Sequence, residues 1–451
     1  MSLKSINPFT NLQIGEFEEF SDNEIYDILN KSSAAFKEWE KKDFRYRKSL
    51  ISQVARTLIG NASEYARSIT YEMGKPLRES KAEVEKCAWV CNYYAQNGED
   101  FLKNEPVITD ASSSYVSYEP LGTILGIMPW NFPFWQVFRF AVPTLLAGNT
   151  VLLKHASNVQ ICARHIENIF TVSRFPTDVF RNLVIGSARV KKIIENDIIR
   201  GVSLTGSEYA GQKVAETAGR NIKKSLLELG GSNAFVVLED ADLEKASEVA
   251  IKARMSNAGQ SCIAAKRFII HEKVSERFLR LFLDKLSKIK TGDPSKEETG
   301  MGPLANIKQA ETIDKQVQTS VQMGARLIEG GKRDNAFYAP TVLTEVKPGM
   351  PVFDEEVFGP VAAFTIVHDY SEAVDMANAT KFGLGVSIFT NDMTKVNQIA
   401  REFKDGAVFV NELVKSDPRL PFGGTWMSGY GRELSQHGIR EFVNVKTVYI
   451  K

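Results

Sequence analysis

The sequence predicts an α/β protein in which parallel sheets are flanked by helices. Short apolar runs alternate with helical patterns from residue 123 onward, and a second block of the same kind follows Gly231. This alternation is typical of right-handed βαβ units, whose ligand crevice lies beyond the carboxyl ends of the parallel strands. The 451 residues are enough for two domains of roughly 200 residues each.

The first hundred residues carry helical patterns. Ser21 and Glu24 have the spacing of a capping box, and Leu50, Val54 and Leu58 share one helical face with Ile51. Residues 77–99 form another predicted helix.

Two cysteines of that helix, Cys87 and Cys91, lie one turn apart. Two thiols at this spacing could in principle hold a metal ion. With no histidine or further cysteine nearby, packing in the core is the favoured interpretation.

The first α/β block has four predicted strands separated by helices. The strands are expected at Thr123–Met128, Thr150–Lys154, Asn182–Ile185 and Val202–Thr205. The helices are expected around 134–147, 159–172, 187–196 and 207–218.

The second block continues this pattern to the end of the chain. Its strands are expected at Ala234–Leu238, Arg267–Ile270, Ala362–Val367, Val386–Phe389 and Ala407–Val410, with helices at 242–257 and 275–288. The apolar tail Thr447–Ile450 has no evident partner of its own. We expect it to add to a sheet, with a neighbouring subunit's sheet as one option.

Composition narrows the class of protein. Lys and Arg number 56 against 55 Asp and Glu, so no surface for nucleic acid is indicated. Four cysteines cannot form a disulfide framework, and no basic, apolar leader precedes Pro8. A cytoplasmic location is therefore expected.

One uncharged stretch, from Pro120 to Phe138, is long enough to span a bilayer if length alone is considered. It contains Pro129 and Pro133, and Arg139 follows it. Prolines remove backbone donors and break helices, so we expect a buried strand and loop here. No membrane association is expected.

Three segments at predicted strand ends or in a loop supply the parts of acyl-type carbonyl chemistry. Cys262 stands in a loop of small and polar residues, Glu228 ends an apolar strand before two glycines, and Asn131 lies in a proline-stiffened loop. A nucleophile, a general base and an oxyanion donor are thereby available. The glycine fingerprint for dinucleotides, the phosphate loop and the H-E-x-x-H motif are absent from the sequence.

Seven motifs in order make the chain resemble the aldehyde dehydrogenase superfamily over essentially its whole length. They are Pro129-Trp130-Asn131-Phe132-Pro133, the strand end at Lys154, Leu204 to Ser207, Leu227 to Gly231, Gly259 to Cys262, Glu356 to Pro360, and Pro421 to Gly424. The resemblance implies a Rossmann-type cofactor domain, an α/β catalytic domain and a small β extension for oligomerisation.

The resemblance also implies a role for each catalytic residue. Cys262 is expected to attack the aldehyde, with the oxyanion between the Asn131 amide and the Cys262 backbone N–H. Glu228 is expected to activate the water that hydrolyses the thioester, which implies a free acid as product. No metal is expected.

For the cofactor, the family's binding mode needs no glycine fingerprint. By resemblance Lys154 and Trp130 face the adenosine half, beside Pro129 of the same motif. Gly206 and Ser207 begin a helix near the pyrophosphate. Glu356 would bind the nicotinamide ribose, and Phe358 would lie beside that ring.

Ser157 favours NADP over NAD. Family members that prefer NAD often carry a glutamate three residues after the lysine, and a serine there removes its repulsion of a 2′-phosphate. Lys154 and also His155 are expected to attract this phosphate. In the alternative interpretation Ser157 only caps the next helix, and both cofactors work.

Arg139 and Ser416 indicate the substrate class. Arg139 follows an apolar helical segment, and a buried arginine needs an anionic partner. The pattern is similar to bacterial succinate-semialdehyde dehydrogenases, in which an arginine and a serine at these positions hold the substrate carboxylate. Trp135 and Ser261 complete the expected substrate site. An internal salt bridge is the alternative for Arg139.

The expected reaction is therefore NAD(P)-dependent oxidation of succinate semialdehyde. Glutarate semialdehyde or an uncharged aliphatic aldehyde is the alternative substrate, and a non-catalytic binding or structural protein is a remote one. Residues 1–99 and 120–228 are assigned to the cofactor domain, 229–432 to the catalytic domain, and 100–119 with 433–451 to the extension. By resemblance the protein is expected to be a homodimer or homotetramer.

Overall fold

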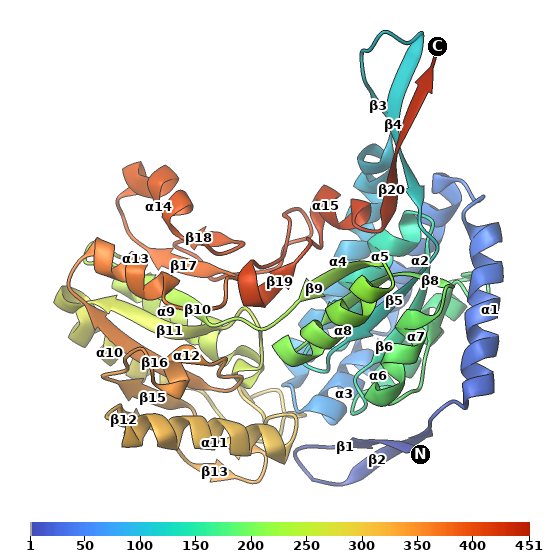
Figure 1. Cartoon of the computed structure of the whole chain (residues 1–451). Helices are drawn as coiled ribbons and strands as arrows, with labels where there is room; N and C mark the ends of the chain where they lie inside the picture. Colours follow the sequence, from blue (N-terminus) through green and yellow to red (C-terminus); the bar gives the residue numbers. More distant parts are fainter. Residues whose placement is uncertain (1) are drawn as a thin grey trace.

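The computed structural model describes residues 2–451 and has two α/β bodies with a projecting arm (Figure 1). Most of the first half of the chain builds one body and most of the second half builds the other, and the arm carries the C-terminus at its tip. Chain segments on either side of the junction between the bodies carry the residues of the candidate site.

The first body holds a sheet in the order β19-β9-β8-β5-β6-β7. Its strands are β5 (Thr123–Met128), β6 (Thr150–His155), β7 (Phe180–Asn182), β8 (Ile199–Thr205), β9 (Lys224–Glu228) and β19 (Gly429–Tyr430). All neighbours are parallel except β19, which runs antiparallel to β9. The predicted strands are confirmed, although β7 begins and ends earlier than expected.

Helices cover both faces of this sheet. They are α1 (Asp22–Trp39), α2 (Phe44–Gly60), α3 (Ala62–Met73), α4 (Leu77–Leu102), α5 (Trp135–Leu146), α6 (Gln160–Val172), η1 (Ser187–Arg189), α7 (Val190–Glu195) and α8 (Glu208–Arg220). The capping box of Ser21 and Glu24 is confirmed at the start of α1. Cys87 and Cys91 are fully buried in the core of α4, as the packing interpretation expects.

The chain begins with a hairpin, which the helical interpretation of the first hundred residues missed. Strands β1 (Ser2–Ile6) and β2 (Gln13–Glu18) pair antiparallel, and the inward side chains Leu3 and Phe17 are buried. The alternation is short, and a hydrogen bond from the Ser5 hydroxyl to buried Glu72 of α3 adds to the docking. The formation of this hairpin therefore depends on its tertiary contacts with the first body.

The second body holds a sheet in the order β12-β15-β16-β11-β10-β17-β18. Its strands are β10 (Asn233–Val237), β11 (Ala265–His271), β12 (Arg326–Glu329), β15 (Thr341–Thr344), β16 (Val361–Val367), β17 (Val386–Phe389) and β18 (Val408–Val410); a hairpin of β13 (Arg333–Asp334) and β14 (Phe337–Tyr338) lies apart. All the expected strands are confirmed, and β12, at the edge, is the antiparallel one.

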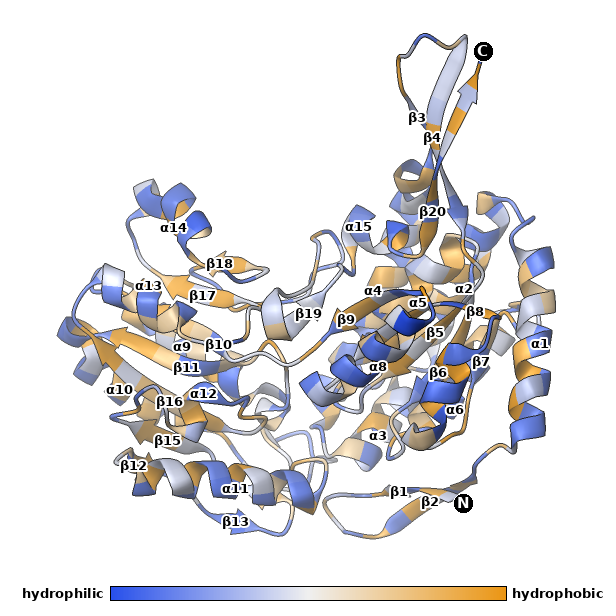
Figure 2. Ribbon diagram, viewed as in Figure 1, coloured by the Kyte–Doolittle hydropathy of each residue, from blue (hydrophilic) through white to orange (hydrophobic). Residues whose placement is uncertain are grey.

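The helices of the second body are α9 (Leu243–Met255), η2 (Ser256–Gly259), α10 (Glu272–Leu286), α11 (Ile307–Gln322), α12 (Pro351–Asp354), α13 (Tyr370–Asn378), η3 (Met393–Lys395) and α14 (Val396–Glu402). Near the C-terminus lie η4 (Trp426–Ser428) and α15 (Ser435–Arg440). In Figure 2 the strands β11 and β17 are largely apolar, whereas the outer helix α14 is polar.

The arm is a sheet of β3 (Glu105–Pro106), β4 (Ser113–Pro120) and β20 (Val443–Ile450). The C-terminal strand thus adds to a sheet, as expected. Its partner is β4 of the same chain, with Val443 opposite Pro120 and Ile450 opposite Ser113, so the expectation of no partner in its own chain is wrong. The sequence concealed this pairing because more than 300 residues separate the strands.

None of the helices in residues 2–451 combines the length and hydrophobicity needed to cross a bilayer. The stretch from Pro120 to Phe138 forms β5, a loop and the start of α5. The strand-and-loop interpretation of its first part is confirmed.

Candidate active site

The loop that carries Cys262 has a constrained backbone. After α9, Asn257 and Ala258 have positive φ angles of 54° and 51°, and Gly259 has 73°. A Cβ on Gly259 would lie 2.3 Å from the Gly359 carbonyl oxygen. Positive φ at non-glycine residues persists where the surroundings enforce it, and such strain concentrates at functional sites.

Two buried cations hold this loop through its carbonyl groups. Arg254 donates from Nη2 to the Gly259 carbonyl at 2.8 Å and from Nη1 to the Ala265 carbonyl at 2.9 Å. Lys266 donates to the carbonyl oxygens of Ser261 and Cys262 at 2.9 and 2.7 Å. Motif reasoning missed both residues, although each lies within eight positions of Cys262.

The Cys262 thiol is protonated in this environment. Burial raises its pKa to about 11, and the positive charges of Arg139 and Lys266 oppose the shift only in part. Because the thiolate is the nucleophilic form, deprotonation must accompany substrate binding or reaction.

Asn131 is tied to the cysteine loop from the other body. Its side-chain amide donates to the Gln260 carbonyl at 3.0 Å, and the Asn257 amide donates to the Asn131 carbonyl at 2.9 Å. A primary amide has two N–H donors, so one remains for an oxyanion beside Cys262. The structure brings these two predicted residues together across the junction.

Glu228 ends β9, beside Thr205 at the end of β8. Its carboxyl group is buried, and within residues 2–451 nothing donates a hydrogen bond to Oε1. Burial raises its pKa well above the usual value, opposed by Arg139 and reinforced by Glu433. A carboxylate whose pKa is raised is a stronger proton acceptor than an ordinary carboxylate.

Two cavities meet at Cys262. One of about 270 Å³ is lined by Asn131, Gly206, Ser207 and Glu356, together with Pro129, Trp130 and Phe358. The other, of about 750 Å³, is lined by Trp135, Arg139, Ser261 and Ser416. The thiol lies on the wall of both, so a group bound in either can reach it.

The smaller cavity fits the phosphate and nicotinamide end of a dinucleotide. Ser207 caps α8 through a 3.3 Å bond from the Ala210 N–H, so the positive end of this helix opens on the cavity. Glu356 accepts from the Gly231 N–H at 3.0 Å and leaves an oxygen for a hydroxyl group. A Cβ on Gly230 would lie 2.4 Å from Glu356 Oε2, so a larger residue there would displace this carboxylate group.

A third cavity, of about 650 Å³, continues along α7 and α8 and is lined by Lys154. Trp130 was expected with Lys154 but lies instead in the smaller cavity beside Cys262, edge-on to Phe358 at 5.8 Å. Lys154 is buried, which lowers its pKa, and the negative charge of Glu19 opposes this shift.

His155 does not attract a phosphate group, contrary to expectation. It is fully buried, Nδ1 accepts from the Ala156 N–H at 2.9 Å, and Nε2 lies 2.9 Å from the Pro133 carbonyl. Burial lowers its pKa to about 4, so the ring is neutral.

Ser157 does not cap the next helix either, because α6 begins after Val159 with no side-chain cap. The capping alternative for Ser157 is therefore wrong.

Arg139 is paired inside the protein. It forms an ion pair with Glu433, both side chains being almost fully buried, and donates to the Thr205 hydroxyl at 3.2 Å. The argument that buried Arg139 needs a substrate carboxylate as its anionic partner therefore fails, because Glu433 of the same chain supplies the anion. Glu433 lies beyond the motifs, and nothing in the sequence connects it with Arg139.

Ser416 lines the larger cavity, as do Ser261 and Cys262 of the nucleophile's loop. Its hydroxyl accepts from Trp135 Nε1 at 3.1 Å and from Lys86 Nζ at 2.8 Å. Lys86 of α4 was not predicted as a site residue.

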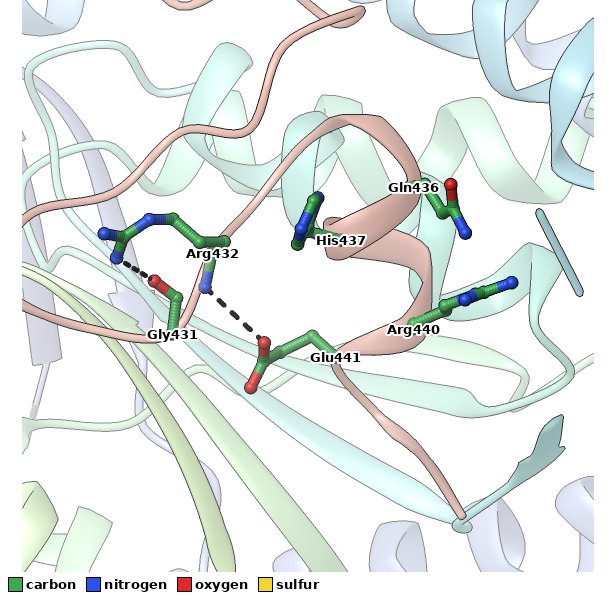
Figure 3. A pocket seen from close by; sticks show the side chains of 6 residues that line it. All are labelled: Gly431, Arg432, Gln436, His437, Arg440 and Glu441. Carbon is green, nitrogen blue, oxygen red and sulfur yellow. Dashed lines mark hydrogen bonds between the residues drawn. The ribbon is translucent and has the colours of Figure 1, made fainter. Parts of the chain in front are cut away.

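A separate cavity of about 500 Å³ lies beside the arm, formed by Arg432, Gln436, His437, Arg440 and Glu441 with Gly431 (Figure 3). None of the predicted site residues lines it. Within residues 2–451 no group of three or more histidine, cysteine or acidic side chains is placed to hold a metal ion.

Known proteins resemble this chain in fold and in sequence. Residues 1–448 match the aldehyde dehydrogenase family. The chain is 46% identical to a probable NADP(+) succinate-semialdehyde dehydrogenase of Synechocystis sp., with all of both chains covered. It is 43% identical to an NAD(P)+ succinate semialdehyde dehydrogenase of Escherichia coli, covering 99% of this chain and 97% of that one.

Among solved structures, succinic semialdehyde dehydrogenase from Streptococcus pyogenes in complex with NADP+ is 36% identical. The two chains superpose with a TM-score of 0.97 over 99% of each. The match over nearly the whole chain, together with the cysteine between two cavities, shows that this protein belongs to the aldehyde dehydrogenase family.

Proposed function

We propose that the protein oxidises succinate semialdehyde to succinate with NADP as the preferred hydride acceptor. One observation carries the proposal: Cys262 lies where a cavity suited to a dinucleotide meets a larger cavity with polar and cationic side chains. The names of the Synechocystis and Streptococcus relatives support both the substrate and the cofactor.

In the proposed reaction Cys262 loses its proton and attacks the aldehyde carbon. The free N–H of Asn131 and the Cys262 backbone N–H stabilise the oxyanion of the thiohemiacetal. A bound nicotinamide supplies the hydride acceptor. Glu228 then takes a proton from water, which hydrolyses the thioester and releases the acid.

The cofactor residues are assigned by the same reasoning. Gly206 and Ser207 bind the pyrophosphate, Glu356 binds the nicotinamide ribose, and Phe358 and Trp130 bound the ring. Lys154 binds the 2′-phosphate in the third cavity, since no carboxylate stands at Ser157 to repel it.

We also infer a homodimer or homotetramer that assembles through the arm. Strand β20 lies at a sheet edge and leaves Val445, Tyr449 and Ile450 half exposed. An apolar edge strand of this kind is a template for pairing with another chain. Removal of residues 443–451 should give monomers in light-scattering measurements.

Initial rates test the function directly. Purified protein should oxidise succinate semialdehyde with a higher kcat/KM than butanal or glutarate semialdehyde, and with a higher kcat/KM for NADP than for NAD. Preference for glutarate semialdehyde or butanal would select the alternative substrate class. Absence of turnover with every aldehyde would contradict the catalytic assignment.

A further inference from the structure

Lys266 is a buried cation that is bonded to the backbone on both sides of the nucleophile. It lies on β11, and its side chain is fully buried. Its Nζ donates to the Ser261 carbonyl oxygen at 2.9 Å and to the Cys262 carbonyl oxygen at 2.7 Å. These oxygens belong to the two peptide units that flank the Cys262 side chain, so one ammonium group holds both.

Glu356 faces the remaining donor of this ammonium group. Its Oε1 lies 3.4 Å from Lys266 Nζ and also accepts from the Gly231 N–H at 3.0 Å. An ammonium group has three donors, so Lys266 has none left for a substrate. Nor does it line either of the two cavities that meet at Cys262. Any effect of Lys266 on the reaction therefore passes through the groups that it holds.

The peptide unit between Ser261 and Cys262 carries the N–H group that the proposed mechanism assigns to the oxyanion. Its carbonyl oxygen accepts from Lys266 and, at the longer distance of 3.2 Å, from the Ala264 N–H. At the other end of this peptide, the Cys262 N–H donates to no backbone group within residues 2–451. A cation bonded to the carbonyl oxygen draws electron density from the N–H, because hydrogen bonds in a chain polarise one another.

The same charge also acts on the thiol. Burial lowers the pKa of Lys266 to about 8, with the charge of Glu356 opposing this shift, so the ammonium form predominates at neutral pH. Burial raises the pKa of the Cys262 thiol, and the charges of Arg139 and Lys266 oppose this rise. An experiment therefore has to separate stabilisation of the thiolate from stabilisation of the oxyanion.

We propose that Lys266 polarises the Ser261–Cys262 peptide and thereby makes the Cys262 N–H a stronger donor to the oxyanion. This inference rests on the proposed function, which makes Cys262 the nucleophile. Lys266 is a positioning residue, since it acts through the backbone of the nucleophile. The step that it accelerates is the attack on the carbonyl group, in which the C–S bond forms and the electron pair of the C=O π bond moves to the oxygen.

Two reactions of Cys262 that need no cofactor separate the two effects. Acylation by p-nitrophenyl acetate passes through an oxyanion, whereas inactivation by iodoacetamide depends on the thiolate and forms no oxyanion. Lys266→Met removes the charge at a similar side-chain length. Its acylation rate constant should fall about tenfold more than its alkylation rate constant, which is less than the roughly 10²- to 10³-fold cost of losing a whole oxyanion donor.

A second variant and a control guard against loss of the fold. Lys266→Gln is neutral but keeps a side-chain donor for the buried acceptors, and it should show the same selective loss because the charge is removed. Circular dichroism establishes that each variant is folded. Lys273→Met, which removes an exposed lysine at the start of α10, is the control and should change neither rate constant.

The outcomes distinguish this inference from the proposed function. If the wild-type protein oxidises no aldehyde, the proposed function is wrong. If the wild type oxidises succinate semialdehyde and a folded Lys266 variant keeps the wild-type ratio of acylation to alkylation, Lys266 acts on the thiol alone; the inference is then wrong and the function stands. Unchanged rate constants with a raised KM for NADP would place the effect at Glu356 and would also overturn the inference.

Discussion

The two cavities that meet at Cys262 are built in different ways. On the cofactor side, the backbone at the start of α8 lines the cavity together with the side chains of Glu356 and Phe358. On the substrate side the wall is made of side chains from separate elements, among them Lys86 and Ser416. The smaller cavity therefore offers the positive end of a helix to an anion, whereas the larger cavity offers side chains alone.

The substrate wall itself contains a second contrast. Among the cations that line this cavity, Arg139 forms a buried ion pair with Glu433, whereas Lys86 forms no ion pair within residues 2–451. A paired cation contributes to the structure, and an unpaired one is available to a ligand. Substitutions can therefore distinguish side chains that take part in the reaction from those that stabilise the structure and those that select the ligand.

Cys262→Ala has the largest expected effect, because it removes the group shared by both cavities. Oxidation of every aldehyde should fall by at least about 10⁴-fold, since no other group can form the thioester. NADP binding, measured by titration calorimetry, should remain within about threefold, because the groups assigned to the cofactor, such as the start of α8 and Glu356, are left intact. Residual turnover near the wild-type level would remove Cys262 as the nucleophile.

Glu228→Gln should slow the second half of the reaction by about 10²- to 10⁴-fold, the usual contribution of a general base. A burst of reduced cofactor followed by a slow steady state is expected in stopped-flow measurements. In the wild type, the hydrolysis step should speed up with rising pH, because the raised pKa of Glu228 keeps it protonated at low pH. The variant should lose this pH dependence. If the variant shows no burst and turns over at the wild-type rate, another group activates the water.

Arg139→Met should act on stability rather than on substrate choice. It leaves Glu433 buried without a partner, which typically costs about 3–5 kcal/mol in the free energy of unfolding. Urea denaturation measures this loss, and Arg139→Met combined with Glu433→Leu should recover most of it. The ratio of kcat/KM for succinate semialdehyde to that for butanal should not change; a selective loss for the acid would restore Arg139 as its clamp.

Ser157→Glu has the smallest expected effect and concerns only the adenosine end. The new carboxylate would repel the 2′-phosphate near Lys154, so the ratio of kcat/KM for NADP to that for NAD should fall about tenfold. Ser157→Ala, which adds no charge, is the control and should leave the ratio within about twofold. An unchanged ratio in the glutamate variant would contradict the role given to this position.

Much of this organisation follows from local sequence patterns. Alternating strands and helices predict the two parallel sheets, and in a parallel sheet the strand ends share one edge. For this reason Asn131 after β5 and Glu228 at the end of β9 could be placed near a common crevice from the sequence. The elements missed, such as the hairpin of β1 and β2, are short and depend on docking to the body.

The sequence by itself thus predicted the fold class and gave Cys262, Glu228 and Asn131 as candidate catalytic residues, because the alternation of strands and helices and the motifs are properties of short segments. Only the tertiary structure decided which charges are neutralised. The pairing of Arg139 with Glu433, the neutral state of His155 and the hydrogen bond from Lys86 to Ser416 arise from contacts between segments distant along the chain. Burial and the identity of the nearest opposite charge set the role of an ionisable group, and neither can be obtained from its neighbours in the sequence.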